Sequence, residues 1–250
     1  MDESSSEGAA VKKTFKVTVL GDGSVGKSSV CNRFCKDFFA REYKQTLGLD
    51  FFSQSMNMPD KSEVVFNLFD IGGQSLQSKM LKTYAAGSDA VLLVYDLTSL
   101  ESLESLVQWK KLSQLPDSCT CIMVGNKSDL ATKRAVQGVH QERVALELGV
   151  KKQFNISALT GDRVQMMFVA LAGLLTNQDV EKLMLEERKV VKAVVKEEDL
   201  KTASALNQQG TAIGKVQKQA YDVIKAEVAE GQNKPDVQNA PVKKRLCGGM

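Results

Sequence analysis

The sequence has few of the features that mark membrane-spanning, secreted or nucleic-acid-binding proteins. It has no apolar run of the roughly eighteen residues that a transmembrane helix needs. Its first residues, Met-Asp-Glu-Ser, are acidic and polar, so we expect no secretory signal peptide. A formal net charge of +3 gives no reason to expect a nucleic-acid partner. We therefore expect a cytoplasmic protein whose function must be sought in its motifs.

Histidine and cysteine are too sparse to suggest a metal centre or histidine-based catalysis. The only histidine, His140, lies at the start of a polar segment, so we interpret it as a surface residue and not as a general base. The five cysteines lie at positions 31, 35, 119, 121 and 247 and show no zinc-site spacing. This pattern indicates reduced thiols in a cytosolic protein.

A glycine-rich segment follows the first apolar run of the chain. Residues 21–28 read Gly-Asp-Gly-Ser-Val-Gly-Lys-Ser and match the phosphate-binding pattern G-x-x-x-x-G-K-S/T. Glycines let backbone N–H groups surround a polyphosphate, and the helix that follows points its positive end at the same anion. Lys27 supplies a charge for the β- and γ-phosphates, and Ser28 supplies a hydroxyl for Mg²⁺. The alternative is a glycine-rich turn without function.

A second polar segment, Asn126-Lys127-Ser128-Asp129, also follows an apolar run. It is therefore expected at the carboxyl end of a strand, where open α/β sheets bind ligands. The Asp129 carboxylate can accept hydrogen bonds from guanine N1–H and the 2-amino group, a pair that adenine lacks. Alone, this segment could equally be a surface turn. After a phosphate loop, it indicates a guanine nucleotide and leaves a metabolic phosphate-loop kinase without support.

Together with three further segments, these motifs resemble the five sequence boxes of the Ras superfamily of small GTPases. Thr46 lies in a segment similar to switch I, residues 70–74 (Asp-Ile-Gly-Gly-Gln) resemble the switch II box, and residues 157–159 (Ser-Ala-Leu) resemble the last box. The resemblance covers residues 14–177. Residues 47–51 and 93–98 resemble Rab signatures. Residues 43–52, the glycine pair before Gln74 and residues 79–81 are similar to the divergent branch called Rab twenty-eight.

The resemblance implies GTP or GDP and Mg²⁺ as ligands. The implied nucleotide contacts are Gly21, Asp22, Gly23, Ser24, Val25, Gly26, Lys27, Ser28, Ser29, Phe39, Thr46, Gly73, Asn126, Lys127, Asp129, Ser157, Ala158 and Leu159. The implied metal ligands are Ser28, Thr46 and, through water, Asp70.

Several individual roles follow from the same resemblance. Gln74 would orient the attacking water, and the backbone N–H groups of Thr46 and Gly73 would contact the γ-phosphate. The Ala158 N–H would donate to guanine O6. The Phe39 ring would cover one face of guanine, with its neighbour Phe38, or simple core packing of Phe39, as alternatives.

Three positions depart from the family pattern. Gly23 precedes Ser24 where Rabs commonly have the reverse order, which leaves more room for Gln74. Ile71-Gly72 replaces the usual Thr-Ala, so we expect a less ordered GDP state, because a glycine costs ~0.5–1 kcal/mol of ordering. Tyr43 occupies the switch I position from which some relatives supply an arginine. Slow intrinsic hydrolysis is therefore expected, with an arginine supplied by a partner worth roughly 10³–10⁵-fold.

The alternation of strand and helix patterns predicts an α/β fold with a mostly parallel sheet. Six strands are expected at 14–20, 50–58, 62–70, 88–95, 119–125 and 153–156. Five helices are expected at 27–36, 75–86, 100–114, 136–148 and 163–176. Trp109, in the helix expected at 100–114, should pack in the core or contact a partner. The resembled fold is a phosphate-loop NTPase with a six-stranded sheet, one antiparallel edge strand and helices on both faces.

The chain divides into four expected regions: a disordered N-terminus at 1–13, the GTPase domain at 14–177, an amphipathic helical extension at 178–230 and a flexible tether at 231–250. The extension could be a marginal helix in solution, a helix that binds a partner, or a helix that packs on the domain. Cys247 is fourth from the end with Met last, a match to the prenylation signal except that Gly248 and Gly249 are not aliphatic. Lys243, Lys244 and Arg245 would strengthen attachment to an anionic membrane.

These features together predict a Rab-like switch in membrane trafficking. It would hydrolyse GTP and work through effectors, an exchange factor and a GTPase-activating protein. It would cycle between cytoplasm and the cytoplasmic face of internal membranes, with endosomal or ciliary routes suggested by the resemblance. The alternative is a non-hydrolysing scaffold in which nucleotide is structural and the helical tail acts.

Overall fold

The computed structural model describes residues 12–58, 62–75 and 79–185. The expected disordered N-terminus lies almost entirely outside this part of the chain. The tether, most of the amphipathic extension, and Cys247 with its three basic neighbours also lie outside it. What was expected of these segments therefore stays a prediction.

The described residues form a six-stranded sheet whose strand order is β2-β3-β1-β4-β5-β6. The strands are β1 (Lys12–Leu20), β2 (Leu49–Asn57), β3 (Glu63–Ile71), β4 (Ala90–Asp96), β5 (Thr120–Asn126) and β6 (Lys152–Asn155). Only the pairing of edge strand β2 with β3 is antiparallel, and the other four pairings are parallel. The predicted fold class, including its antiparallel edge strand, is confirmed.

Helices connect the parallel strands. They are α1 (Lys27–Lys36), α2 (Met80–Ala85), α3 (Leu100–Glu104), α4 (Leu106–Ser113), α5 (Gly138–Leu148) and α6 (Val164–Thr176), with a short 3₁₀ turn at Ala131–Lys133. Two differ from expectation. The helix expected at 75–86 is shorter, because Ser75 N–H closes a turn onto the Gly72 carbonyl at 2.9 Å. The helix expected at 100–114 is divided at Ser105, whose hydroxyl bonds outside its own helix.

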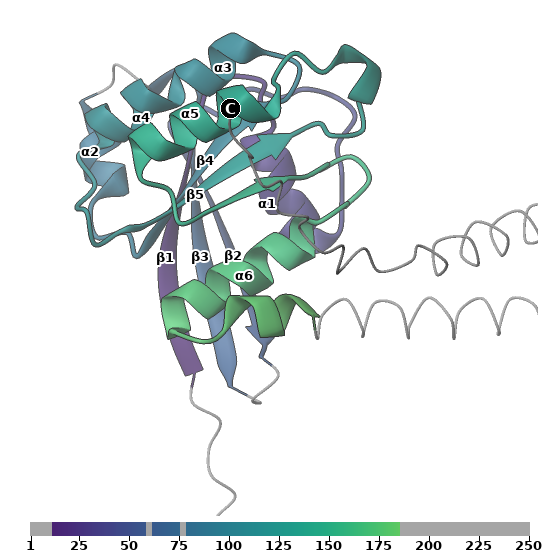
Figure 1. Cartoon of the computed structure of the whole chain (residues 1–250). Coiled ribbons are helices and arrows are strands. Elements are labelled where there is room, and N and C mark those ends of the chain that lie inside the picture. The colour runs from purple at the N-terminus through teal and green to yellow at the C-terminus, as the bar shows by residue number, and fades with distance from the viewer. Residues whose placement is uncertain (1–11, 59–61, 76–78, 186–250) are drawn as a thin grey trace, which may run out of the picture. The chain divides into compact units, whose positions relative to one another are not determined.

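The sheet carries one apolar cluster on each face. The first contains the buried side chains of α1 and α6, and the second contains those of α2 to α5. Figure 1 shows where these helices lie around the sheet. Strand β4 is buried along its whole length, with Leu92 and Val94 in the first cluster and Val91, Leu93 and Tyr95 in the second. This alternation makes β4 a central strand covered on both faces.

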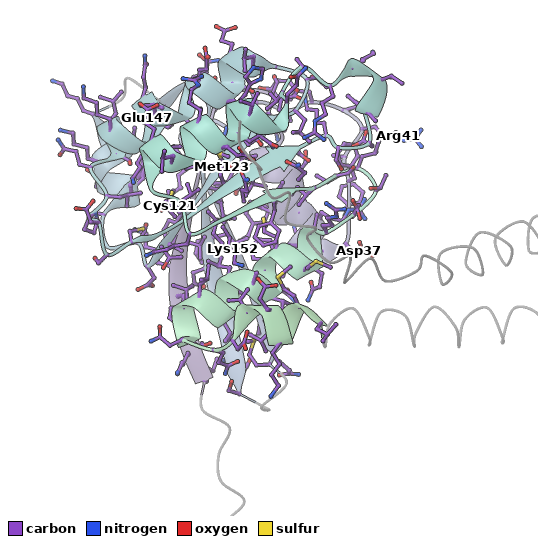
Figure 2. All side chains as sticks on the ribbon, viewed as in Figure 1. Asp37, Arg41, Cys121, Met123, Glu147 and Lys152 are labelled. Atoms are coloured by element: carbon purple, nitrogen blue, oxygen red, sulfur yellow. The ribbon has the colours of Figure 1, made fainter. Side chains whose placement is uncertain are left out.

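Strand β5 shows how the second face is closed. Cys121 and Met123 lie in the cluster beneath α5, whereas Glu147 lies on the outer, exposed side of that helix (Figure 2). Four cysteines, at 31, 35, 119 and 121, carry free thiols, as predicted. Within the described ranges, no helix has the length and apolar character needed to cross a bilayer.

The packed domain continues past its expected end at residue 177. Asp179 accepts backbone hydrogen bonds from Glu181 and Lys182, which begins a helical segment at 180–185. Val180 and Leu183 of this segment are buried in the first cluster. The first turn of the amphipathic extension therefore packs on the domain, and its continuation lies outside the described residues.

Candidate nucleotide-binding site

The phosphate loop joins the carboxyl end of β1 to the start of α1, as predicted. Gly21 has φ +142°, and a Cβ there would lie 2.0 Å from the Val94 carbonyl oxygen. Gly26 has φ +96°, and a Cβ there would lie 2.3 Å from Asn126 Nδ2. Both glycines therefore permit a backbone conformation and a close approach that any side chain would prevent.

Lys27 lies inside the loop instead of extending into solvent. Its Nζ donates hydrogen bonds to the carbonyl oxygens of Gly21 and Asp22, both at 2.8 Å, and the residue is only 6% exposed. Burial lowers the pKa of Lys27, while the nearby carboxylates of Asp70 and Asp22 act in the opposite direction. The ammonium group is thus held in place at the loop. Burial disfavours its positive charge, and a bound anionic ligand would favour that charge again.

The three predicted metal ligands converge from three separate segments. Ser28 Oγ lies 2.9 Å from Thr46 Oγ1 and donates to Asp70 Oδ2, and Thr46 Oγ1 lies 3.5 Å from the same carboxylate oxygen. Asp70 is fully buried at the end of β3. The structure therefore brings the phosphate loop, switch I and switch II together at one point.

Asp70 is a buried carboxylate with one oxygen available to bind a cation. Its Oδ1 is buried and finds no hydrogen-bond partner among the described residues. Burial raises the pKa of Asp70, against the effects of the Ser28 hydroxyl and Lys27. One carboxylate and two hydroxyls are hard oxygen donors of the kind Mg²⁺ uses when phosphates and water complete its shell. The residues fit Mg²⁺, and within the described ranges no group of three His, Cys, Asp or Glu forms another metal site.

Switch II packs directly on switch I and on the phosphate loop. Gly72 N–H donates to the Gly48 carbonyl at 2.9 Å, and a Cβ on Gly72 would lie 2.4 Å from the Thr46 carbonyl oxygen. A Cβ on Gly73 would lie 2.2 Å from the Gly23 nitrogen. The glycine pair, read in the sequence as a source of flexibility, thus also makes this close packing possible.

Gln74 follows the glycine pair and is exposed. A Cβ built on Gly23 would lie 3.5 Å from Gln74 Nε2, an ordinary contact distance. The structure therefore places the predicted catalytic side chain beside Gly23. The extra room expected from the inverted Gly-Ser order lies where Gln74 is found.

Asn126 connects the guanine box to both neighbouring loops. Its Nδ2 donates to the Val25 carbonyl at 2.9 Å, and its Oδ1 accepts from Ala158 N–H at 3.0 Å. Ser157 Oγ donates to Asp129 Oδ1 at 2.5 Å and so orients the exposed carboxylate expected to bind guanine. The N–H expected to reach guanine O6 is therefore already bonded to Asn126, and the O6 contact requires this hydrogen bond to be shared.

Comparison with known sequences identifies the family. A profile described as the Ras family matches residues 16–177. The chain belongs to the Ras family. Ras-related protein Rab-28 of Caenorhabditis elegans is 37% identical over 175 residues, which cover 67% of this chain and 69% of that relative. The chain is thus a Rab-like member of the Ras superfamily, as the sequence boxes indicated.

The guanine base itself has two aromatic candidates in this Ras-family chain. Phe39 is partly buried and packs against the first apolar cluster, whereas Phe38 is 54% exposed. Phe39 thus has one side against the core, whereas Phe38 has none. Among the other predicted contacts, Ser24 is exposed with φ +62°, Ser29 lies in the first turn of α1, and Leu159 is 47% exposed.

Two residues that sequence reasoning missed support the guanine boxes. Asp96 Oδ2 pairs with Lys127 Nζ at 2.6 Å, and Thr98 donates to the other oxygen from both its N–H and its hydroxyl. The position of Asp96 at the carboxyl end of β4 was a signal in the sequence that could have revealed this supporting role. Arg33 donates from Nε to the Ala158 carbonyl at 2.9 Å and from Nη2 to the Leu159 carbonyl at 2.7 Å. No local motif marks Arg33.

Proposed function

We propose that this protein is a molecular switch that binds GTP and GDP with Mg²⁺, slowly hydrolyses GTP to GDP and phosphate, and regulates membrane trafficking. The observation that carries this proposal is the convergence of Ser28, Thr46 and Asp70 beside Lys27. Ser28 comes from the phosphate loop, Thr46 from switch I and Asp70 from switch II. A ligand that bridges them favours one arrangement of both switches over others.

The residues of the chain divide the work of binding. The phosphate loop supplies N–H donors and the Lys27 charge. The Asp129 carboxylate, which Ser157 orients, selects guanine. Ser28, Thr46 and Asp70 would hold Mg²⁺. When bound, Mg²⁺ would neutralise charge on the phosphates. Thr46 is the only one of these groups supplied by switch I, so its engagement would couple that segment to the state of the nucleotide.

Hydrolysis would depend mainly on positioning. Gln74 is the side chain that would orient the attacking water, and Gly23 leaves the space beside it open. Tyr43, at the position where some relatives carry an arginine, is 68% exposed and cannot replace its charge. Intrinsic hydrolysis should therefore be slow, and an arginine supplied by a GTPase-activating protein would raise it by roughly 10³–10⁵-fold.

The proposed trafficking role rests on the switch loops and on the C-terminal segment. Ordered switch loops would be read by effectors, while an exchange factor would reload the nucleotide. A prenyl group on Cys247 would give weak attachment that Lys243, Lys244 and Arg245 reinforce on an anionic leaflet by ~1 kcal/mol each. Such reversible attachment suits a protein that cycles between cytoplasm and internal membranes, on an endosomal or a ciliary route.

Nucleotide selectivity tests this proposal. The purified protein, stripped of nucleotide, would be titrated with fluorescent GDP, GTP and ATP, with and without Mg²⁺. We expect tight binding of both guanine nucleotides, strengthened by Mg²⁺, and no measurable binding of ATP. Asp129→Ala should lose guanine selectivity, whereas Asp117→Ala, at an exposed site between α4 and β5, should not. Equal binding of ATP and GTP would overturn the assignment.

A further inference from the structure

Asp22, the second residue of the phosphate loop, turns its side chain away from the loop and toward α4. Its Oδ1 accepts a hydrogen bond from Trp109 Nε1–H at 2.7 Å. Its Oδ2 accepts one from the Ser105 hydroxyl at 2.6 Å. That hydroxyl has a single hydrogen and lies farther, at 3.1 Å, from the Ser102 carbonyl, so Asp22 is its preferred partner. Both carboxylate oxygens are thus held, one by Trp109 of α4 and the other by Ser105, the residue immediately before that helix.

Trp109 is well suited to act as a fixed donor. It is fully buried in the second apolar cluster beside Leu103 and Leu106, so its indole cannot rotate away from the loop. A buried indole N–H without a partner would be costly, and Asp22 supplies that partner. The prediction that Trp109 packs in the core is correct, and its indole N–H also binds the Asp22 carboxylate.

The backbone of Asp22 is part of the phosphate site that its side chain anchors. The Asp22 carbonyl accepts a hydrogen bond from Lys27 Nζ at 2.8 Å. A Cβ on Gly73 of switch II would lie 2.5 Å from the Asp22 carbonyl carbon. Helix α4 also packs against α2, which follows switch II. Any movement of the carboxylate would therefore reach the lysine and the switch through a single residue.

A carboxylate in a loop that binds phosphates is unfavourable unless its charge is directed elsewhere. The two donors hold the charge on the α4 side, where it is neutralised in part by hydrogen bonding. Without them the carboxylate would be free to turn toward the phosphates and to loosen the loop.

We propose that Ser105 and Trp109 are positioning residues that hold the phosphate loop in its nucleotide-binding geometry through Asp22. This inference rests on the proposed function, since it assumes that the loop binds guanine nucleotide. It makes nucleotide retention dependent on α4, a helix that carries none of the five sequence boxes and reaches the phosphate loop through Asp22. It also makes the only tryptophan of the chain a reporter of the state of the loop.

The test compares two serine substitutions at opposite ends of α4: Ser105, just before its first residue, and Ser113, its last. Ser105→Ala removes a hydroxyl that reaches Asp22, whereas Ser113→Ala removes a buried hydroxyl that donates only to its own helix, at the Lys110 carbonyl (2.8 Å). Release of fluorescent GDP should be roughly five- to tenfold faster in Ser105→Ala and Trp109→Phe than in wild type. Ser113→Ala should release GDP at the wild-type rate.

A double-mutant cycle separates positioning from general destabilisation. In an Asp22→Ala background, adding Ser105→Ala should change GDP release by less than about twofold, because its partner is already gone. Tryptophan emission should shift on GDP release in wild type and lose that response in Asp22→Ala. Equal release by Ser105→Ala and Ser113→Ala, or an undiminished effect in the Asp22→Ala background, would overturn this inference alone. A wild-type protein that does not bind GDP would overturn both this inference and the proposed function.

Discussion

Gly72 is a residue at which the two switch segments approach each other closely. Its N–H bonds to switch I, and the missing Cβ leaves room for the Thr46 carbonyl oxygen. The alanine usual in the family at this position would place a carbon 2.4 Å from that oxygen, a distance real Cβ atoms do not show. The tight contact in this protein therefore depends on the departure from the family pattern.

Gly72→Ala should push switch I away from switch II. We expect a loss of about 1–3 kcal/mol in the free energy of unfolding, as for other overpacked sites, measured by urea titration. The matched control is Gly138→Ala at the start of α5, where an added Cβ meets nothing within 4 Å. That variant should be unchanged or up to ~1 kcal/mol more stable. Equal effects at the two sites would contradict the proposed steric role.

Asp96 gives a pH-dependent prediction at the same scale. Burial raises the pKa of Asp96, but hydrogen bonds from Lys127 and Thr98 outweigh burial and hold the pKa below its ordinary value of 3.8. A folded pKa below the unfolded one contributes stability that is fully present above the unfolded value. That stability is lost as the pH falls through the folded value.

Wild type should therefore exceed Asp96→Asn in unfolding free energy at neutral pH, and the difference should shrink below about pH 4. Urea titrations between about pH 3 and pH 7 would measure it, with Asp117→Asn as the exposed control. A difference between wild type and Asp96→Asn that stays constant over this range would show that the charge of Asp96 is not responsible.

At the scale of elements, α1 connects the two halves of the nucleotide site. Its first turn carries Lys27 and Ser28, and its last turn carries Arg33, which bonds to the Ala158 and Leu159 carbonyls. The guanidinium also pairs with Asp37 at 2.8 Å, so its orientation is fixed. A single helix thus sets the distance between the phosphate loop and the loop expected to contact guanine.

Arg33→Ala should release GDP roughly tenfold faster, since a charged hydrogen-bonding group is worth about 1.5–3 kcal/mol. The fitting control is Arg143→Ala, which removes an arginine that pairs with Glu104 on the exposed surface. Stopped-flow release of fluorescent GDP would measure both. If the two arginine variants behaved alike, Arg33 would have no special part in holding the guanine loop.

The elements also show which parts of the fold the sequence could predict. Strongly patterned segments such as β4 and α6 lie within two residues of their predicted bounds, because each is a nearly continuous apolar run bounded by polar residues. The helix after switch II was predicted too long, since tertiary contacts of Gly72 and Gly73 fix that segment. The five boxes located the site, but Arg33 and Asp96 act across the sheet, and their partnerships depend on topology.

At the scale of the whole molecule, the domain is larger than its motifs suggested. The amphipathic extension was expected from residue 178, and its first turn packs against α6. A Cβ on Gly173 would lie 2.8 Å from Leu183 Cδ1 and 3.0 Å from Val180 Cγ2. Glycine at 173 thus allows the first turn of the extension to pack on the domain, and the three alternatives for the rest of the extension lie outside the described residues.

Leu183→Ala should lower the free energy of unfolding by about 2–3 kcal/mol through the cavity it leaves. Leu185→Ala, two residues later on the same segment, should cost less than about 0.5 kcal/mol, because that side chain is 53% exposed. Thermal or urea unfolding of the full chain would compare them. Equal, small losses would show that the extension does not pack on the domain in solution.

Single-turnover hydrolysis of GTP, with wild type beside Gln74→Leu, tests the central claim most directly. The purified protein would be loaded with GTP in the presence of Mg²⁺, without any partner protein. We expect slow but measurable release of phosphate by wild type, lost in Gln74→Leu while GTP remains tightly bound. Tight binding with no hydrolysis in either protein would contradict the switch and favour a scaffold that acts through its helical tail.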